Sequence, residues 1–213
     1  MIPEFYTLIG KPVGAINLAE FWDVSECFQW ERLRRTVADA VEMLDDRVDD
    51  MVFSIPEIAT DVKDFRRISL SVMGWADLLF KMGMKYGGNM SFNFASSVSC
   101  FIYSSALIKS LHLGQKKGAY PACQEHTPLH TRNASFYEPL DCPQELAQLA
   151  GCSPGIYPVY DHTTHPEYLK ACADIKDQRI GMGVFVSSHE VEPKDFASMQ
   201  RIFRTGGNHR WTK

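Results

Sequence analysis

The sequence has 213 residues, enough for a single domain with a sizeable buried core. Hydrophobic residues make up 45% and charged residues 23%, which excludes a disordered chain, a collagen-like repeat and a small disulfide-stapled scaffold. The formal net charge of −4 at pH 7 predicts no basic surface, so we expect no nucleic-acid partner.

The six cysteines are widely spaced and include no C-x-x-C pair. The first residues show no basic segment followed by a long apolar core, so no secretory signal is expected. We therefore expect reduced thiols and a cytoplasmic or other reducing compartment. No apolar run approaches the roughly 18–20 residues that cross a bilayer, and no membrane partner is expected.

Residues 1–74 predict two strands and two helices. Residues Ala15–Phe21 are apolar and read as a strand, although Gly14 and Pro12 interrupt the pattern before them. A helix is expected from Trp30 to about Met51, because apolar residues recur there every three or four positions. A short second helix is expected over Ile58–Phe65, and alternation with serine predicts a strand over Ile68–Val72.

The chain from residue 75 onward is richer in helices. Helices are expected over Trp75–Met82, about Ser91–Lys117, Thr164 to about Asp177, and from Pro193 onward. Prolines make residues 119–165 irregular, and Gly183–Ser187 reads as a further short strand. The pattern favours one α/β or α+β domain over residues 1–213, helix-rich with short strands.

One set of loop residues has the spacing of a zinc site. Cys123, His126 and His130 form C-x2-H-x3-H, and His162 and His165 follow. Neighbouring prolines and the lack of any C-x-x-C pair favour polar residues in exposed loops instead.

A cluster of four aspartates lies at the end of the first helix, at positions 45, 46, 49 and 50. Carboxylates are ligands for hard divalent cations, but a solvated helix face is the simpler interpretation.

Five segments carry a family resemblance. Arg66–Leu79 reads RRISLSVMGWADLL and aligns without a gap with "RRIGLGVMGFADLL". The other matching segments, in chain order, are Gly14–Phe21 ("NLGSINLA"), Lys117–Pro121 ("RGAFP"), Arg132–Ser135 ("RNAT") and Gly151–Pro158 ("GTSSGIEP"). Together they resemble the large, catalytic subunit of ribonucleotide reductase, closest to the adenosylcobalamin-dependent type. The resemblance implies the second half of a ten-stranded α/β barrel, a half barrel.

The resemblance also implies catalytic residues that the sequence does not supply. The family's finger loop carries Asn-x-Cys-x-Glu, whose cysteine becomes the thiyl radical, and Met1–Val13 contains no cysteine. Of the two redox cysteines, one belongs just before the "NLGSINL" segment, where Val13 stands near its place. We therefore assign no catalytic residue to this chain and expect no autonomous reductase activity.

The segment that would bind substrate phosphate is altered. The family reads "APTGTIS" there, whereas Glu138–Leu146 has no glycine, serine or threonine and carries three carboxylates. Small residues expose backbone N–H groups and hydroxyls to phosphate, and carboxylates repel it. The equivalent of the phosphate loop is expected to be inactive; its residues are Asp141, Cys142, Pro143, Gln144 and Glu145.

Three functions from different classes remain open. The first is a non-catalytic binding or structural subunit of a larger assembly, with no cofactor bound by this chain alone. The second is the back half of a split reductase, which makes deoxynucleotides only with a partner chain and then uses adenosylcobalamin. The third is an unrelated small-molecule enzyme on the same scaffold. A half barrel leaves open strand edges, so we expect a protein partner or self-association that covers them.

Overall fold

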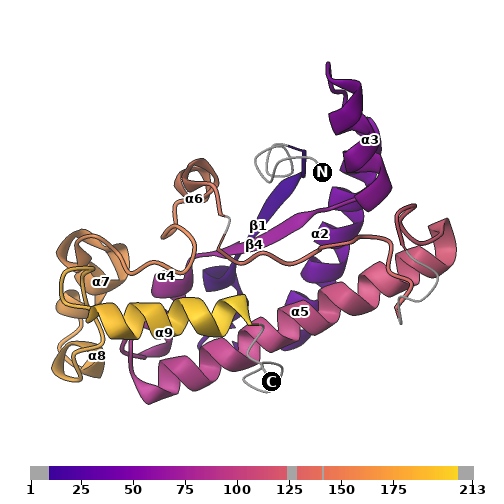
Figure 1. The fold of residues 1–213 in the computed structure, drawn as a ribbon. Coiled ribbons are helices and arrows are strands. Elements are labelled where there is room, and N and C mark those ends of the chain that lie inside the picture. The colour runs from indigo at the N-terminus through magenta and orange to yellow at the C-terminus, as the bar shows by residue number, and fades with distance from the viewer. Residues whose placement is uncertain (1–9, 124–128, 141, 206–213) are drawn as a thin grey trace.

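A computed structural model describes residues 10–123, 129–140 and 142–205. Its centre is a parallel pair of strands, β1 (Val13–Asn17) and β4 (Ser69–Met73), whose register runs from Val13 opposite Ser69 to Asn17 opposite Met73. The connection between them holds α2 (Trp30–Asp50) and α3 (Pro56–Phe65), as Figure 1 shows. Parallel strands require such a long crossover.

The predicted strand over Ala15–Phe21 is wrong at both ends. The strand begins at Val13 and ends at Asn17, whose side-chain oxygen accepts a hydrogen bond from the Ala19 N–H at 3.2 Å. This cap turns the chain into a short 3-10 helix, η1 (Leu18–Phe21). A two-residue antiparallel pair follows, β2 (Trp22–Asp23) with β3 (Cys27–Phe28).

An extended segment, residues 134–140, borders the other side of β4. The Ile68 N–H donates to the Ser135 carbonyl and the Glu138 N–H to the Leu70 carbonyl, both at 3.0 Å. In the part of the chain that the structure describes, β4 is therefore central and β1 lies at an edge.

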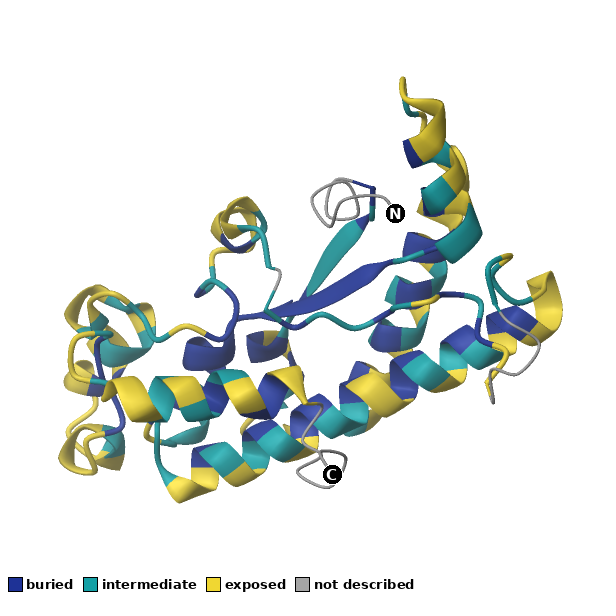
Figure 2. Cartoon of the chain, viewed as in Figure 1, coloured by how far each residue is buried: buried dark blue, intermediate teal, exposed yellow. Residues whose placement is uncertain are grey.

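The helix periodicity read from the sequence matches the core. The apolar positions of α2 are all buried: Leu33, Val37, Val41, Leu44 and Val48. The longest helix, α5 (Asn89–Lys117), lies against α2 and against α9 (Pro193–Arg204) (Figure 1). Figure 2 shows buried and exposed residues alternating along α5 and α9, and a mostly buried β4.

Gly74, between β4 and α4 (Trp75–Met82), has a backbone that requires glycine. Its φ is +72°, and a Cβ there would lie 2.1 Å from the side-chain oxygen of Asn17. The close approach holds the start of α4 against the end of β1.

The last third of the chain differs most from the expectations. A helix, α6 (Gln144–Ala150), occupies part of the region expected to be irregular. The expected helix from Thr164 is shorter: η2 (His162–Thr164), α7 (Pro166–Ala173) and α8 (Gln178–Gly181) are separate turns. Gly183–Ser187 is not a strand, although Val184, Phe185 and Val186 are buried; its chain contributes side chains to the core without pairing in the sheet.

Among the described residues one helix, α5, is long and apolar enough to cross a membrane by length and composition. Core helices of soluble proteins pass the same test, and α5 buries Val98, Ile102 and Ala106 in the core. The expectation of no membrane segment stays a prediction.

The helix-rich architecture with few short strands is confirmed. The half barrel stays a prediction.

Candidate functional site

Asp45 is the centre of a buried network of charged and polar groups. The solvated helix face expected for the aspartate cluster is wrong at this position, because Asp45 is 0% exposed. Its Oδ1 accepts from the guanidinium of Arg66 at 2.9 Å and from the Asn133 amide at 3.0 Å, and its Oδ2 lies 3.4 Å from Lys117. Asp46, by contrast, is exposed.

This network explains two of the sequence motifs structurally. Arg66 caps α3 in the left-handed conformation (φ 46°) and also binds Asp49, whose pKa it lowers through the hydrogen bond. Arg132 places its Nε 3.4 Å from Asp45, beside Asn133. Arg66 of RRISLSV and the RNAS segment thus hold the end of α2 to the chain that leads into the altered phosphate loop.

The altered loop begins with an ion pair. Lys11 lies just before β1 and its side chain is 7% exposed. It contacts the carboxylate of Glu138, which also accepts from the Ser135 hydroxyl at 2.9 Å. Pro139 uses its carbonyl to accept from the Ser71 hydroxyl at 3.1 Å. Polar groups at the start of the loop are therefore satisfied within the protein.

The residues expected at the phosphate position lie at the beginning of α6. Pro143 is the N-cap and has no N–H, while Gln144 and Glu145 form the first turn. No side chain caps this helix end. Asp141 lies outside the described residues.

Cys142 and Cys152 lie on either side of α6. Burial raises the pKa of the Cys142 thiol. Burial, together with the negative charge of Asp77, raises the pKa of Cys152 to about 11. Both thiols are protonated at neutral pH, which makes them poor nucleophiles.

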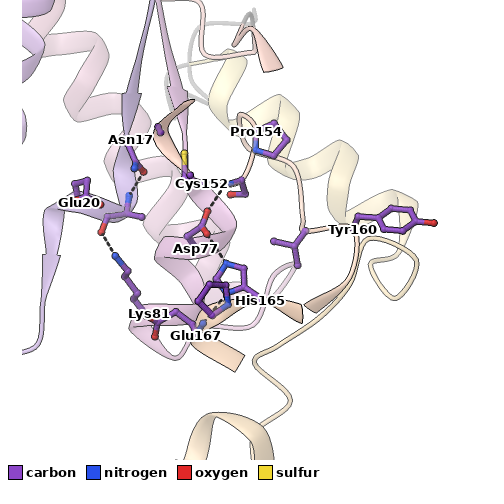
Figure 3. A pocket seen from close by; sticks show the side chains of 15 residues that line it. Asn17, Glu20, Asp77, Lys81, Cys152, Pro154, Tyr160, His165 and Glu167 are labelled. Carbon is purple, nitrogen blue, oxygen red and sulfur yellow. Dashed lines mark hydrogen bonds and ion pairs between the residues drawn. The ribbon is translucent and has the colours of Figure 1, made fainter. Parts of the chain in front are cut away.

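A cleft of about 390 Å³ lies at the carboxyl ends of β1 and β4 (Figure 3). Ligand sites in parallel sheets form at this end of the strands. The lining comes from η1, α4, α7 and the loop after α6; the polar members are Asn17, Glu20, Asp77, Lys81, Cys152, Ser153, Tyr160, His165 and Glu167. Figure 3 shows Tyr160 pointing away from the other labelled side chains.

Asp77 and His165 form a pair at the base of this cleft. The Nε2 of His165 lies 2.7 Å from Asp77 Oδ1, and the Ser153 N–H donates to the other carboxylate oxygen at 2.7 Å. His165 Nδ1 accepts from the Glu167 N–H and caps α7, so the proton lies on Nε2. Burial alone would raise the pKa of Asp77, but the hydrogen bonds from His165 and Ser153 outweigh burial and lower it.

The zinc candidates do not meet in one place. His162 contacts the Ser187 hydroxyl at 2.8 Å, and His165 contacts Asp77. His130 is exposed. Its carbonyl oxygen lies against α5, so close to Gly114 that a Cβ added there would be 2.2 Å from it. His126 lies outside the described residues, and among those described, Cys123 included, no three metal-ligating side chains gather.

Residues 12–144 match the family described as "Ribonucleotide reductase, barrel domain". The chain belongs to this family. A "Vitamin B12-dependent ribonucleoside-diphosphate reductase" of Thermoplasma acidophilum is 29% identical over 152 residues, which cover 70% of this chain and 20% of the relative.

Two further relatives agree. A protein of the same description from Mycobacterium tuberculosis (strain CDC 1551 / Oshkosh) is 28% identical over 153 residues, covering 70% of this chain and 22% of its own. A "Ribonucleoside-diphosphate reductase subunit alpha" of Chlamydia trachomatis is 32% identical over 108 residues, covering 51% of this chain and 10% of its own. This chain thus spans about a fifth of the B12-dependent relatives, and the resemblance seen in the motifs is confirmed.

Sequence reasoning missed the two pairs that organise these sites. Lys11 and Glu138 are 127 positions apart, and Asp77 and His165 are 88 apart. The one signal is indirect: Glu138 replaces a small or apolar residue of the family segment, and a partly buried carboxylate is stabilised by a cation or donors nearby.

Proposed function

We propose that this chain is a ribonucleotide-reductase-like barrel segment that serves as a non-catalytic binding or structural part of a larger assembly. The observation that carries the proposal is the Lys11–Glu138 ion pair. It joins the entry of β1, where the family resemblance calls for a redox cysteine, to the first residue of the altered phosphate loop. The first carboxylate of the altered loop is thereby engaged within the protein.

The rest of the loop supports the same conclusion. Pro143 and Gln144 supply neither a hydroxyl nor a glycine at the start of α6, and Glu145 adds a negative charge. A carboxylate near a polyphosphate raises the free energy of the bound state. We expect the loop to have a folding or contact function.

The experiment is a titration with nucleoside di- and triphosphates, followed by NMR at physiological salt. We expect no saturable binding by the unmodified chain. Glu145→Thr restores a hydroxyl and removes the charge, so this variant should not lower whatever weak affinity for nucleotide is measured. A dissociation constant below about 100 μM, abolished by changes in residues 142–145, would overturn the proposal.

The outer edge of β1 is the proposed contact surface for a protein partner or a second copy. The Ser69 N–H donates to the Pro12 carbonyl at 3.0 Å, so by strand alternation Val13, Ala15 and Asn17 direct their backbone groups away from β4. No described residue pairs with them. An apolar groove of about 520 Å³ borders this edge; its apolar lining includes Ile16, Met43, Leu44, Leu70 and Met73.

Proline tests the edge without disturbing the sheet. Ala15→Pro removes an outward N–H and no bond to β4, so it blocks strand addition while β1–β4 pairing remains. We expect sedimentation to show association at micromolar concentration, weakened by Ala15→Pro. A stable, soluble monomer of the unmodified chain under these conditions would refute the self-association form of the proposal. Affinity capture that recovers no stoichiometric protein would refute the partner form.

The second candidate is the back half of a split reductase. The observation that favours it is the match to B12-dependent reductases over 70% of the chain. In this form of the proposal adenosylcobalamin acts only when the partner chain completes the reductase. Capture of a partner carrying Asn-x-Cys-x-Glu, with deoxynucleotide formation by the pair, would establish this function in place of the first.

A further inference from the structure

The two central strands differ in how deeply they are buried. Four of the five residues of β1 are half-buried, whereas all five residues of β4 are buried, a contrast that Figure 2 shows. The backbone groups of Val13, Ala15 and Asn17 are directed away from β4, and no described residue pairs with them. An unpaired edge of this kind is a template for one more strand.

The groove of about 520 Å³ beside this edge is apolar. Gly14 faces α2, because a Cβ there would lie 3.5 Å from the Leu44 side chain. Ile16, two positions further along the strand, faces the same way and is buried. Met43 of α2 also lines the groove and is 65% exposed. A strand added at the edge places every second side chain on this face, so these side chains should be apolar to cover Met43.

Unpaired carboxylates border the groove. Glu20 and Asp39 line it, and neither forms an ion pair within the part of the chain that the structure describes. A second hollow on α2, of about 450 Å³, shares Asp39 with the groove and also includes Asp50, which has no ion pair among the described residues either. Carboxylates on one surface attract a cationic partner.

Cations of this chain offset that negative charge only in part. Arg32 also lines the groove, but its guanidinium donates to the Glu20 carbonyl at 2.8 Å. Arg47 lines the second hollow, whose remaining carboxylates are paired with Lys109 and Lys117. Three unpaired carboxylates thus face two arginines. A second copy of the chain would bring the same carboxylates and a net charge of −4, so a cationic segment is the more complementary occupant.

Building on the proposed binding function, we propose that the edge of β1 binds an extended segment of another protein, with apolar side chains at every second position and Lys or Arg at its ends. The segment adds a strand to the sheet, and its backbone bonds to the outward groups of Val13, Ala15 and Asn17. Its apolar side chains cover Met43, and its cations approach the carboxylates beside the groove.

The experiment uses the peptide Lys-Val-Thr-Val-Thr-Val-Lys, acetylated and amidated, which is titrated into the isotopically labelled full chain and followed by two-dimensional NMR. We expect saturable shifts at residues 13–17 and 39–43, with a dissociation constant of about 0.1–1 mM. The same peptide with glutamate in place of both lysines should bind at least about fivefold more weakly. Lower salt should strengthen binding of the lysine peptide.

Three variants of the chain separate backbone pairing from charge. Ala15→Pro lacks the central outward N–H and should weaken binding at least about tenfold. Asp39→Lys reverses an exposed charge beside the groove and should weaken binding at least about fivefold. Glu57→Lys makes the same change at an exposed position of α3 that lines neither hollow, and it should alter the affinity by less than about twofold.

The contrary results are specific. Shifts that do not saturate below about 5 mM peptide, or that Ala15→Pro leaves unchanged, would overturn strand addition at this edge. Equal binding of the glutamate peptide, or equal effects of Asp39→Lys and Glu57→Lys, would overturn the choice of a cationic segment. Self-association of the chain that lower salt strengthens would make a second copy the complementary occupant and overturn the same choice. None of these outcomes depends on whether nucleotides bind at residues 142–145, so a failure of this site and a failure of the proposed function are told apart.

Discussion

Replacing Asp45 with asparagine tests the energetic importance of the buried network. The change keeps the size of the side chain and removes its charge, so no cavity forms and the effect is electrostatic. Breaking a buried ion pair by removing one partner costs about 3–5 kcal/mol, because the other charge stays buried. Arg66 is 3% exposed but keeps Asp49, at 2.6 Å, as a second partner. We therefore expect the lower end, about 3 kcal/mol, or roughly a hundredfold in the folding equilibrium.

The assay is urea denaturation of the unmodified chain, Asp45→Asn and the neighbouring Asp46→Asn. Asp46 pairs with Lys117 at the surface, where its side chain is 61% exposed. A pair of this kind contributes about 0–1 kcal/mol, so Asp46→Asn should lower the free energy of unfolding by less than 1 kcal/mol. If Asp45→Asn costs no more than Asp46→Asn, with equal denaturant slopes, the network is not the stabilising hub described above.

Three further predictions follow from single sites. Gly74→Ala should lower the free energy of unfolding by about 2 kcal/mol or more, because it adds a Cβ in a left-handed backbone and against Asn17; a thermal shift below a few degrees would contradict this. Cys152, with a pKa of about 11, should react with iodoacetamide at pH 8 at least tenfold more slowly than the exposed Cys172, as measured by mass spectrometry of the labelled peptides; equal rates would show that the thiol is not buried as described. The pKa of Asp77 is lowered in the folded state, so its stabilisation is present above its usual pKa of 3.8 and is lost as the pH falls through the lower folded value. The difference in stability between the chain and Asp77→Asn should accordingly be constant above about pH 5 and shrink below pH 3.8; a difference that grows in acid would reverse the sign.

Local patterns predicted the elements that have one clear face. The expected helices over Trp30–Met51 and Ser91–Lys117 match α2 and α5 to within two residues. In α2 an apolar stripe specifies the helix, whereas α5 buries small and polar residues such as Ser99 and Ser105 as well as apolar ones. The strand over Ile68–Val72 is displaced by one residue. The family motifs could be recognised because each is a contiguous run of residues.

The failures share a different cause. Asp45 looked like its exposed neighbours, and only Arg66 and Asn133, brought from other segments, show that it is buried. The run at Gly183–Ser187 has the composition of a strand, but pairing depends on a neighbouring strand that no local pattern can reveal. The contacts of the candidate sites join positions 11 with 138 and 77 with 165, which only the folded chain brings together.

The pairing of β1 with β4 sets an order of events during protein synthesis. Val13 cannot pair in the sheet until Ser69, 56 positions later, has been synthesised. At about 5–20 residues per second, a ribosome takes roughly 3–11 s to synthesise that interval. Helices form within about a microsecond, so α2 can coil long before the sheet that it covers exists. The apolar stripe of α2 is thus exposed for seconds in every newly made chain, and we expect this interval to be the one in which the nascent protein depends most on chaperones.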